Sequence, residues 1–116
     1  MRPARKHCPA EITLHLIDHR WKLLIFRELL RGTRRFSALQ RRIPPVSRRV
    51  LATQLRELER DGLVQREVFP EVPLRVQYSL TRVGKSLRPV LLAMHNWGAR
   101  HAKRLSRLRK QPTGSL

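Results

Sequence analysis

The chain has 116 residues, which is enough for one domain with a modest hydrophobic core. Its 26 Lys and Arg outnumber its 8 Asp and Glu, and the resulting net charge of +18 favours polyanionic partners, nucleic acid above all. A single cysteine excludes an intrachain disulfide, and the lack of a long apolar run or a signal-peptide pattern predicts a cytoplasmic protein without a membrane partner.

The first elements predicted from the sequence are helical. Residues 1–7 are expected to form a basic, flexible arm. Pro9 suits the first turn of a helix that ends near Asp18. Asp18 is expected to cap a second helix over residues 20–31, which is apolar around most of its circumference and is therefore predicted to be buried. Residues 33–35 form a short link that could add one edge strand to a small sheet.

A helix-turn-helix is predicted over residues 36–63. A short helix at 37–43 is followed by a proline-rich turn and a longer helix at 47–61. Ser47 suits the N-cap of the longer helix, because its hydroxyl can accept a hydrogen bond from a free backbone N–H group. Gly62 suits the left-handed position that follows the end of a helix.

The longer helix has two different faces. Leu51, Leu55 and Leu58 are four and three residues apart, so they share a face directed at the core. The outer face begins with arginines and small residues, and its acids come late, which suits a helix whose first turns meet DNA. The candidate DNA-binding residues of this helix are Ser47, Arg48, Arg49, Thr53 and Arg56. The first two are expected at phosphates and the other three at bases or the adjacent backbone, whereas the alternative is a solvated surface helix with charge pairs.

After this helix the apolar period changes to two. Residues 64–69 and 75–80 alternate and predict a β-hairpin with a proline-rich loop. A hairpin directly after a recognition helix is the wing of a winged helix, and Arg75 is its candidate DNA contact. The predicted fold class is therefore mainly α with a small antiparallel β-hairpin (α+β), in a winged helix-turn-helix arrangement.

The last part of the chain predicts another helix. Thr81 can cap it, and Pro89 should kink or break it. Apolar residues then recur three and four apart, in a seam that fits either the domain's own core or, as we favour, a homodimer. The candidate dimer-interface residues are Leu91, Met94 and Trp97. We set the domain at residues 8–104 and a basic tail at 105–116, which either aids solubility or adds phosphate contacts.

Motifs for catalysis or metal binding are missing from the sequence. We find no phosphate-binding glycine loop, no His-Glu-x-x-His and no Cys-x-x-Cys. His15 and His19 are four residues apart and could share a metal, but no third ligand is evident. We therefore expect no cofactor, no metal and no enzymatic activity. The rival hypothesis is an enzyme or small-ligand protein whose basic surface serves an anionic substrate.

Several short motifs occur in order along most of the chain. They include Cys8-Pro9, Trp21-Lys22-Leu23-Leu24-Ile25, Arg35-Phe36, Gln54-Leu55-Arg56-Glu57-Leu58-Glu59, Asp61-Gly62-Leu63-Val64, Pro70-Glu71-Val72-Pro73 and Tyr78-Ser79-Leu80-Thr81. This ordered set resembles the HxlR family of bacterial winged helix-turn-helix transcriptional regulators, which act as repressors or activators.

The resemblance implies a homodimer joined through its N- and C-terminal helices and bound to double-stranded DNA. Its two recognition helices would enter successive major grooves about 34 Å apart and read an inverted or direct repeat. Several such regulators sense electrophiles, oxidants or aldehydes through a cysteine near the N-terminus, where this chain has Cys8. Basic neighbours and a helix start would favour its thiolate, whereas the alternative is an inert residue at the start of the helix.

The high net charge is also consistent with a second hypothesis about the function of the chain. A non-specific architectural protein could bind nucleic acid through its positive charge alone, with an affinity that falls steeply as salt rises. The sequence names neither the operator nor the inducer.

Overall fold

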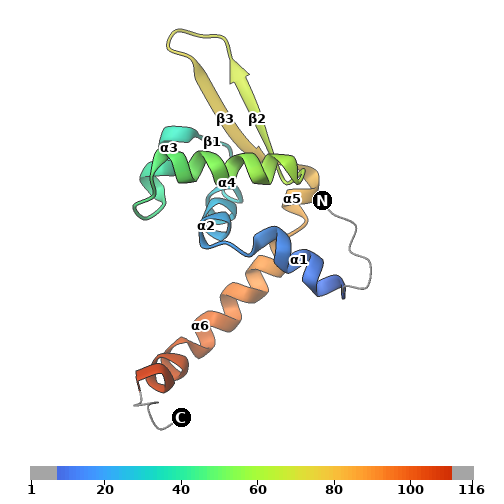
Figure 1. The fold of residues 1–116 in the computed structure, drawn as a ribbon, viewed down its shortest axis with the longest axis vertical. Coiled ribbons are helices and arrows are strands. Elements are labelled where there is room, and N and C mark those ends of the chain that lie inside the picture. Colours follow the sequence, from blue (N-terminus) through green and yellow to red (C-terminus); the bar gives the residue numbers. More distant parts are fainter. Residues whose placement is uncertain (1–7, 111–116) are drawn as a thin grey trace. The chain divides into compact units, whose positions relative to one another are not determined.

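The part of the chain that the structure describes is mainly helical with one small antiparallel sheet, as predicted. The computed structural model describes residues 8–110, which divide after Ser86 into two compact units. The first unit contains α1 (Pro9–Ile17), α2 (Arg20–Leu29), β1 (Arg34–Arg35), α3 (Phe36–Arg42), α4 (Arg48–Arg60), β2 (Val64–Phe69), β3 (Arg75–Leu80) and α5 (Arg82–Lys85) (Figure 1). The second unit contains α6 (Arg88–Lys110).

The boundary between α1 and α2 differs from the sequence prediction at the cap. Pro9 lies in the first turn of α1, and Asp18 is the residue at its C-terminal end. The N-cap of α2 is His19, whose ring Nδ1 accepts a hydrogen bond from the backbone N–H of Trp21 at 3.2 Å. The prediction that Asp18 caps α2 is therefore wrong, because the chain turns one residue later and the imidazole nitrogen replaces a carboxylate as acceptor.

Helices α3 and α4 form the predicted helix-turn-helix. Ile43 is extended (φ −91°, ψ 142°), as a residue before proline prefers, so α3 ends there. The side-chain amide of Gln40 donates a hydrogen bond to the Val46 carbonyl at 3.2 Å and ties α3 to the turn. The Ser47 hydroxyl accepts from the backbone N–H three residues later at 3.1 Å, which confirms the cap of α4. Gly62 has the predicted positive φ of 75°.

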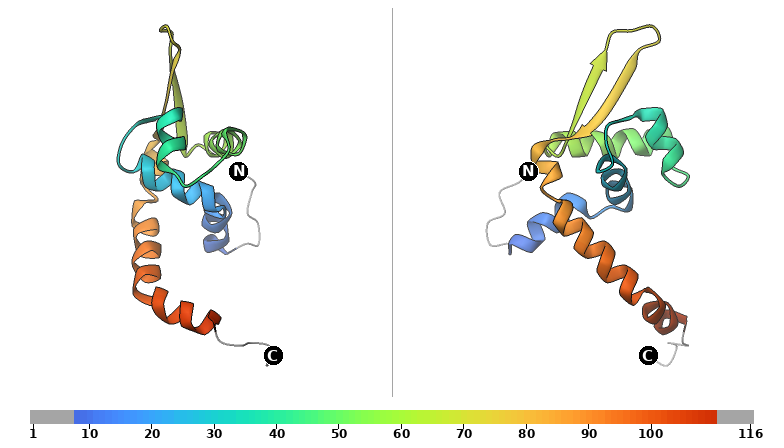
Figure 2. Two further views of the ribbon diagram at one scale, coloured as in Figure 1. Left: turned by 90° about the vertical axis from the view of Figure 1, so that its left-hand side faces the viewer. Right: turned by 180° about the vertical axis from the view of Figure 1, so that it is seen from behind.

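The strands form one antiparallel sheet in the order β1-β3-β2. The register pairs Val64 with Leu80 and Arg66 with Tyr78 between β2 and β3, which confirms the predicted hairpin. The link before α3 supplies the third strand, with Arg34 opposite Tyr78. The β2–β3 hairpin extends well beyond the helices of its unit (Figure 2).

The core of the first unit joins α2, α3, α4 and the base of the sheet. Leu51, Leu55 and Leu58 are at most 1% exposed, which confirms the inward face of α4. Helix α2 is only partly buried, because Trp21 and Leu23 remain half-exposed. The buried apolar residues are Ile17, Ile25, Phe26, Leu29, Leu39, Ile43, Leu51, Leu55, Leu58, Leu63, Val64, Tyr78 and Leu80.

The base of the hairpin is fixed to the C-terminal end of α4. The Thr81 backbone N–H donates to the Leu63 carbonyl at 3.0 Å, and its hydroxyl donates to the Gly62 carbonyl at 2.6 Å. The same hydroxyl accepts from the Gly84 N–H at 3.0 Å and caps α5, as predicted. A Cβ on Gly84 would collide with the Leu63 carbonyl oxygen, so only glycine allows this close approach.

Helix α6 starts where the proline predicts a break. The preceding helix α5 ends at Lys85, and Pro89 lies in the first turn of α6. Helix α6 continues through the boundary predicted after residue 104, while the predicted arm at 1–7 and the last residues of the predicted tail lie outside the described residues. None of the helices described is both long and apolar enough to cross a bilayer.

Candidate nucleic-acid interface

The outer side of α4 carries a row of polar and cationic residues. Arg49 and Arg56 are exposed, with Thr53 between them on the same side. The Thr53 hydroxyl donates a hydrogen bond to the Arg49 carbonyl at 2.9 Å and accepts a longer one from the Arg56 guanidinium at 3.4 Å. The structure thus brings three of the predicted DNA-binding residues together. The guanidinium groups of Arg49 and Arg56 keep N–H donors for other acceptors.

The start of α4 contacts the rest of the motif through an aromatic ring. The Arg48 guanidinium carbon lies 5.0 Å from the centre of the Phe36 ring, a cation–π distance. The Phe36 ring in turn lies 6.4 Å from the Tyr78 ring of β3. Ser47 uses its oxygen as the helix cap, and its hydroxyl hydrogen remains a possible donor to phosphate. Ser47 and Arg48 therefore lie together at the positive end of α4.

The acids of α4 are neutralised by cations of the same unit. The Glu57 carboxylate lies 2.7 Å from the Nζ atom of Lys22, a buried lysine of α2. This hydrogen bond holds the pKa of Glu57 below its ordinary value. Glu59 lies 3.7 Å from the Arg66 guanidinium of β2. The first turns of α4 contain no acid, so the outer face is positive toward its start.

Some of the arginines near the motif are structural. The Arg42 Nε lies 2.7 Å from one carboxylate oxygen of Glu28, and the Arg27 Nε lies 3.4 Å from the other. Burial alone would raise the pKa of Glu28, but the hydrogen bond and charge of Arg42 outweigh burial and lower it. These contacts of Glu28 were not predicted from the sequence, although an acid inside an apolar helix is a signal that a cation must accompany it.

The wing residue Arg75 is engaged inside the hairpin. Its Nη2 lies 2.6 Å from a Glu71 carboxylate oxygen, and its Nε donates to both oxygens at 3.2 and 3.3 Å. Its guanidinium carbon also lies 3.7 Å from the centre of the Phe69 ring. The hydrogen bond from Arg75 lowers the pKa of Glu71, and the same hydrogen bond raises the pKa of Arg75. DNA contact by Arg75 remains a prediction.

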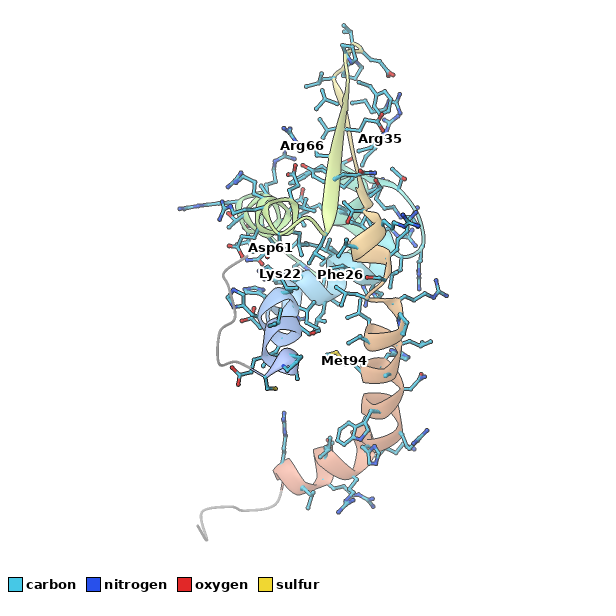
Figure 3. All side chains as sticks on the ribbon, turned by 90° about the vertical axis from the view of Figure 1, so that its right-hand side faces the viewer. Lys22, Phe26, Arg35, Asp61, Arg66 and Met94 are labelled. Atoms are coloured by element: carbon cyan, nitrogen blue, oxygen red, sulfur yellow. The ribbon has the colours of Figure 1, made fainter. Side chains whose placement is uncertain are left out.

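The strand register separates the two faces of the hairpin. Arg66 and Tyr78 face each other on the side that reaches Glu59 of α4. Arg35 lies opposite Gln77, which is the neighbour of Tyr78 in β3. Because successive residues of a strand point to opposite faces, Arg35 lies on the other face of the hairpin. Figure 3 shows Arg35 and Arg66 on opposite sides of the hairpin. By the same alternation, Arg75 shares the face of Arg35, away from α4.

The other predicted site residues lie outside this motif. Cys8 is exposed and is the N-cap of α1, with no hydrogen bond from its side chain to the helix. In α6, Leu91 is half-buried, whereas Met94 and Trp97 are 45% and 56% exposed. The Trp97 ring stacks on His101 at a centroid distance of 4.3 Å. Within residues 8–110, no three His, Cys, Asp or Glu side chains are grouped so that they could hold a metal ion.

Comparison with known proteins identifies the family. A model described as HxlR-like helix-turn-helix matches residues 16–106. The chain belongs to the HxlR-like helix-turn-helix family. YdeP of Bacillus subtilis, named as an HTH-type transcriptional regulator, is 44% identical over 101 residues, which cover 87% of this chain and 79% of that protein. The protein is thus a transcriptional regulator of the HxlR type.

Solved structures of the same type support the fold. The redox regulator HypR in its reduced form superimposes with a TM-score of 0.82 at 42% identity, covering 86% of this chain and 99% of that one. Diamide-treated YodB from B. subtilis gives a TM-score of 0.69 at 37% identity, covering 83% of this chain and 96% of that one. The winged helix-turn-helix predicted from the sequence is confirmed.

Proposed function

We propose that this HxlR-type regulator binds DNA sequence-specifically as a homodimer, without catalytic activity and in the cytoplasm. The observation that carries the proposal is the outer face of α4, which begins with exposed arginines and whose acids are paired with cations of the same unit. A capped helix start with free cations is suited to phosphates and to base edges in the major groove.

The residues of α4 would divide this work by position. Ser47 and Arg48 lie at the helix start and would contact phosphates. Arg49, Thr53 and Arg56 form the row that follows on the outer side of α4, and they would contact bases or the adjacent backbone. Arginine is the common reader of guanine, because its fork matches two acceptors on the major-groove edge.

Substitution within one helix tests this division. Arg49→Ala should weaken operator binding by about 1–3 kcal/mol and relax one position of the selected site. Arg60→Ala in the last turn removes the same charge from the same helix and serves as the matched control. Fluorescence anisotropy measures the affinity of both variants for the operator selected from random duplex DNA and for its single-base variants. An Arg49→Ala loss that is equal on all sequences would reassign Arg49 to phosphate.

The dimer part of the proposal rests on α6. Met94 and Trp97 are large apolar residues that are exposed in a single chain, and Leu91 lies at the same spacing. Such residues in an exposed row are typical of a protein interface. A second copy that covers them would present two recognition helices to one DNA site.

Oxidant sensing through Cys8 is the regulatory part of the proposal. HypR is named a redox regulator, and YodB has been studied after diamide treatment. Because Cys8 is the sole cysteine, a disulfide must join two chains or one chain and a small thiol. Two thiols then lose two protons and two electrons, which reduce an oxidant such as diamide.

A single substitution tests the sensor. Diamide should change DNA binding by the wild type, and dithiothreitol should restore it. Cys8→Ser should bind DNA equally well and no longer respond. A Cys8→Ser protein that still responds to diamide or aldehydes would rule out this thiol as the sensor.

The charge of +18 also favours a second candidate, a non-specific architectural DNA-binding protein. This alternative predicts similar affinities for operator and random duplexes, both falling steeply with salt. A specificity ratio that persists at physiological salt contradicts it.

A further inference from the structure

A row of cations runs along the C-terminal half of α6. Its members are spaced three, one and three residues apart, so they lie on one side of the helix. Their side chains are all exposed. The row spans about 10 Å of the helix axis, because a helix rises about 1.5 Å per residue. We name it the basic stripe, and its members are Arg100, Lys103, Arg104 and Arg107.

The apolar side of the same helical segment points in a different direction. Leu105 and Leu108 are 38% and 46% exposed, and they continue the row of Met94 and Trp97 toward the end of α6. Their centre lies roughly a third of a turn around the helix from the centre of the basic stripe. A second copy that covers the apolar row of the proposed homodimer therefore leaves most of the basic stripe exposed.

Acids do not neutralise the basic stripe. The sequence has no Asp or Glu in residues 72–116. None of the salt bridges among residues 8–110 includes a member of the stripe. Several arginines of the first unit, in contrast, are paired with acids. These are Arg27, Arg42, Arg66 and Arg75.

Helix stability alone does not account for this clustering. Like charges three and four residues apart on a helix repel each other and destabilise it. Cations near a C-terminus interact favourably with the helix dipole, but this effect falls off within the last turn. Arg100 and Lys103 precede the last turn of α6, which ends at Lys110. A bound polyanion would relieve the repulsion that the helix itself leaves in place.

We propose that the basic stripe binds the phosphate backbone of duplex DNA outside the operator. The inference rests on the proposed DNA-binding function and adds a second contact, on α6 instead of α4. Three of the four cations are arginines, whose planar fork matches two phosphate oxygens. Duplex DNA carries one negative charge per about 1.7 Å of its axis, so the length of the stripe matches roughly six phosphates.

This contact adds affinity without sequence reading. Residues 100–109 contain no Asn or Gln, the side chains that pair with adenine in the major groove. Phosphate contacts position a protein on the duplex and carry no base information. The basic stripe therefore accounts for part of the excess positive charge of the chain, while sequence recognition stays with α4.

Duplex DNA fits the stripe better than an anionic membrane does. An amphipathic helix on a bilayer buries its apolar face among the lipids. In the proposed homodimer, the second copy already covers that face of α6. Binding of α4 to its operator also holds DNA close to the protein, so neighbouring DNA is present at a high effective concentration.

The first test neutralises the stripe in the full chain. The variant Arg100→Gln/Lys103→Gln/Arg104→Gln/Arg107→Gln keeps residues of high helix propensity. Fluorescence anisotropy follows its binding to the selected operator with about two helical turns of random sequence on each side. The slope of log affinity against log salt should become shallower by roughly 2–4 per chain, because each lost phosphate contact removes about 0.9. An unchanged slope would overturn the proposal.

Two further variants separate the stripe from net charge and from helix packing. Arg31→Gln/Arg60→Gln/Lys85→Gln/Arg88→Gln removes the same charge from dispersed, exposed positions and should keep a slope close to that of the wild type. A slope as shallow as that of the stripe variant would show that net charge alone sets the binding. Arg100→Lys/Arg104→Lys/Arg107→Lys keeps the charge and should keep the slope. Loss of the slope there, or loss of helicity in far-UV circular dichroism, would assign the effect to packing.

The length and number of duplexes show which DNA the stripe contacts. If it contacts the flanks of the operator, wild-type protein should show the shallower slope on a duplex trimmed to the selected motif. If it contacts another duplex, an immobilised operator complex should capture a second, labelled duplex, and the stripe variant should not. Phosphatidylserine vesicles that bind the wild type but not the stripe variant, without any difference on DNA, would overturn the proposal in favour of a membrane.

The outcomes distinguish this inference from the function on which it rests. Wild-type protein that enriches no sequence from a random pool would count against the proposed function. Wild-type protein and stripe variant that enrich the same motif with equal salt slopes would overturn only the contact made by α6.

Discussion

The ion pair between α2 and α4 is expected to hold the recognition helix in place, with unequal effects of its two partners. The Lys22 side chain is 8% exposed, whereas that of Glu57 is 40% exposed, and their charged atoms are 2.7 Å apart. Removing Glu57 leaves a buried ammonium without a counter-charge. Removing the charge of Lys22 leaves a carboxylate that water can reach.

These exposures set the magnitudes. Breaking a fully buried pair costs about 3–5 kcal/mol, and exposed pairs contribute about 0–1 kcal/mol. Since Glu57 is partly solvated, Glu57→Ala should lower the free energy of unfolding by about 1–3 kcal/mol. Lys22→Met keeps the apolar stem and should cost less than about 1 kcal/mol. The double variant should be no less stable than Glu57→Ala, because the buried charge is gone.

Urea unfolding followed by circular dichroism at a fixed protein concentration measures these differences. The hydrogen bond from Lys22 lowers the pKa of Glu57 in the folded state, so its stabilisation is present above the unfolded pKa and is lost as pH falls through the folded one. The difference in the free energy of unfolding between the wild type and Glu57→Ala should therefore become smaller below about pH 4. A Lys22→Met variant at least as unstable as Glu57→Ala would refute this reasoning.

Gly84→Ala should destabilise the first unit by more than about 1 kcal/mol in urea unfolding, because its Cβ meets the Leu63 backbone; a neutral result would show that α5 can shift. Arg42 and its neighbours lower the pKa of Glu28 despite burial. Glu28→Gln should therefore lower the free energy of unfolding at neutral pH, and its difference from the wild type should disappear in acid; a pH-independent difference would contradict this. Trp97→Ala should weaken dimerisation in sedimentation equilibrium by about ten-fold or more, whereas an unchanged monomer–dimer equilibrium would exclude Trp97 from the interface.

The fold was predictable because its signals are local. Ser47, Gly62 and Thr81 mark helix ends through their own chemistry, and the structure has each of them in that role. The leucines of α4 repeat with the helical period, and their burial follows from it. The cap of α2 was missed because acceptors lie at both Asp18 and His19, and only the path of the chain selects one.

The charged contacts were harder to predict, since they join residues distant in sequence. Lys22 and Glu57 meet only after α2 packs on α4. Their residue types alone indicate two ordinary surface charges. The wing shows the same limit over a shorter range. Arg75 was predicted to be the DNA contact of the wing, and its ion pair was not foreseen, because only the hairpin loop brings Glu71 back to its guanidinium. A basic sequence therefore predicts the class of partner better than it predicts which arginines touch it.

The most direct test of the central claim is selection from random duplex DNA at physiological salt, followed by sequencing of the bound fraction. A homodimeric HxlR-type regulator should enrich a repeated motif with half-sites about one helical turn apart. Binding without any enriched motif, and with affinity that collapses as salt rises, would contradict sequence-specific recognition by α4.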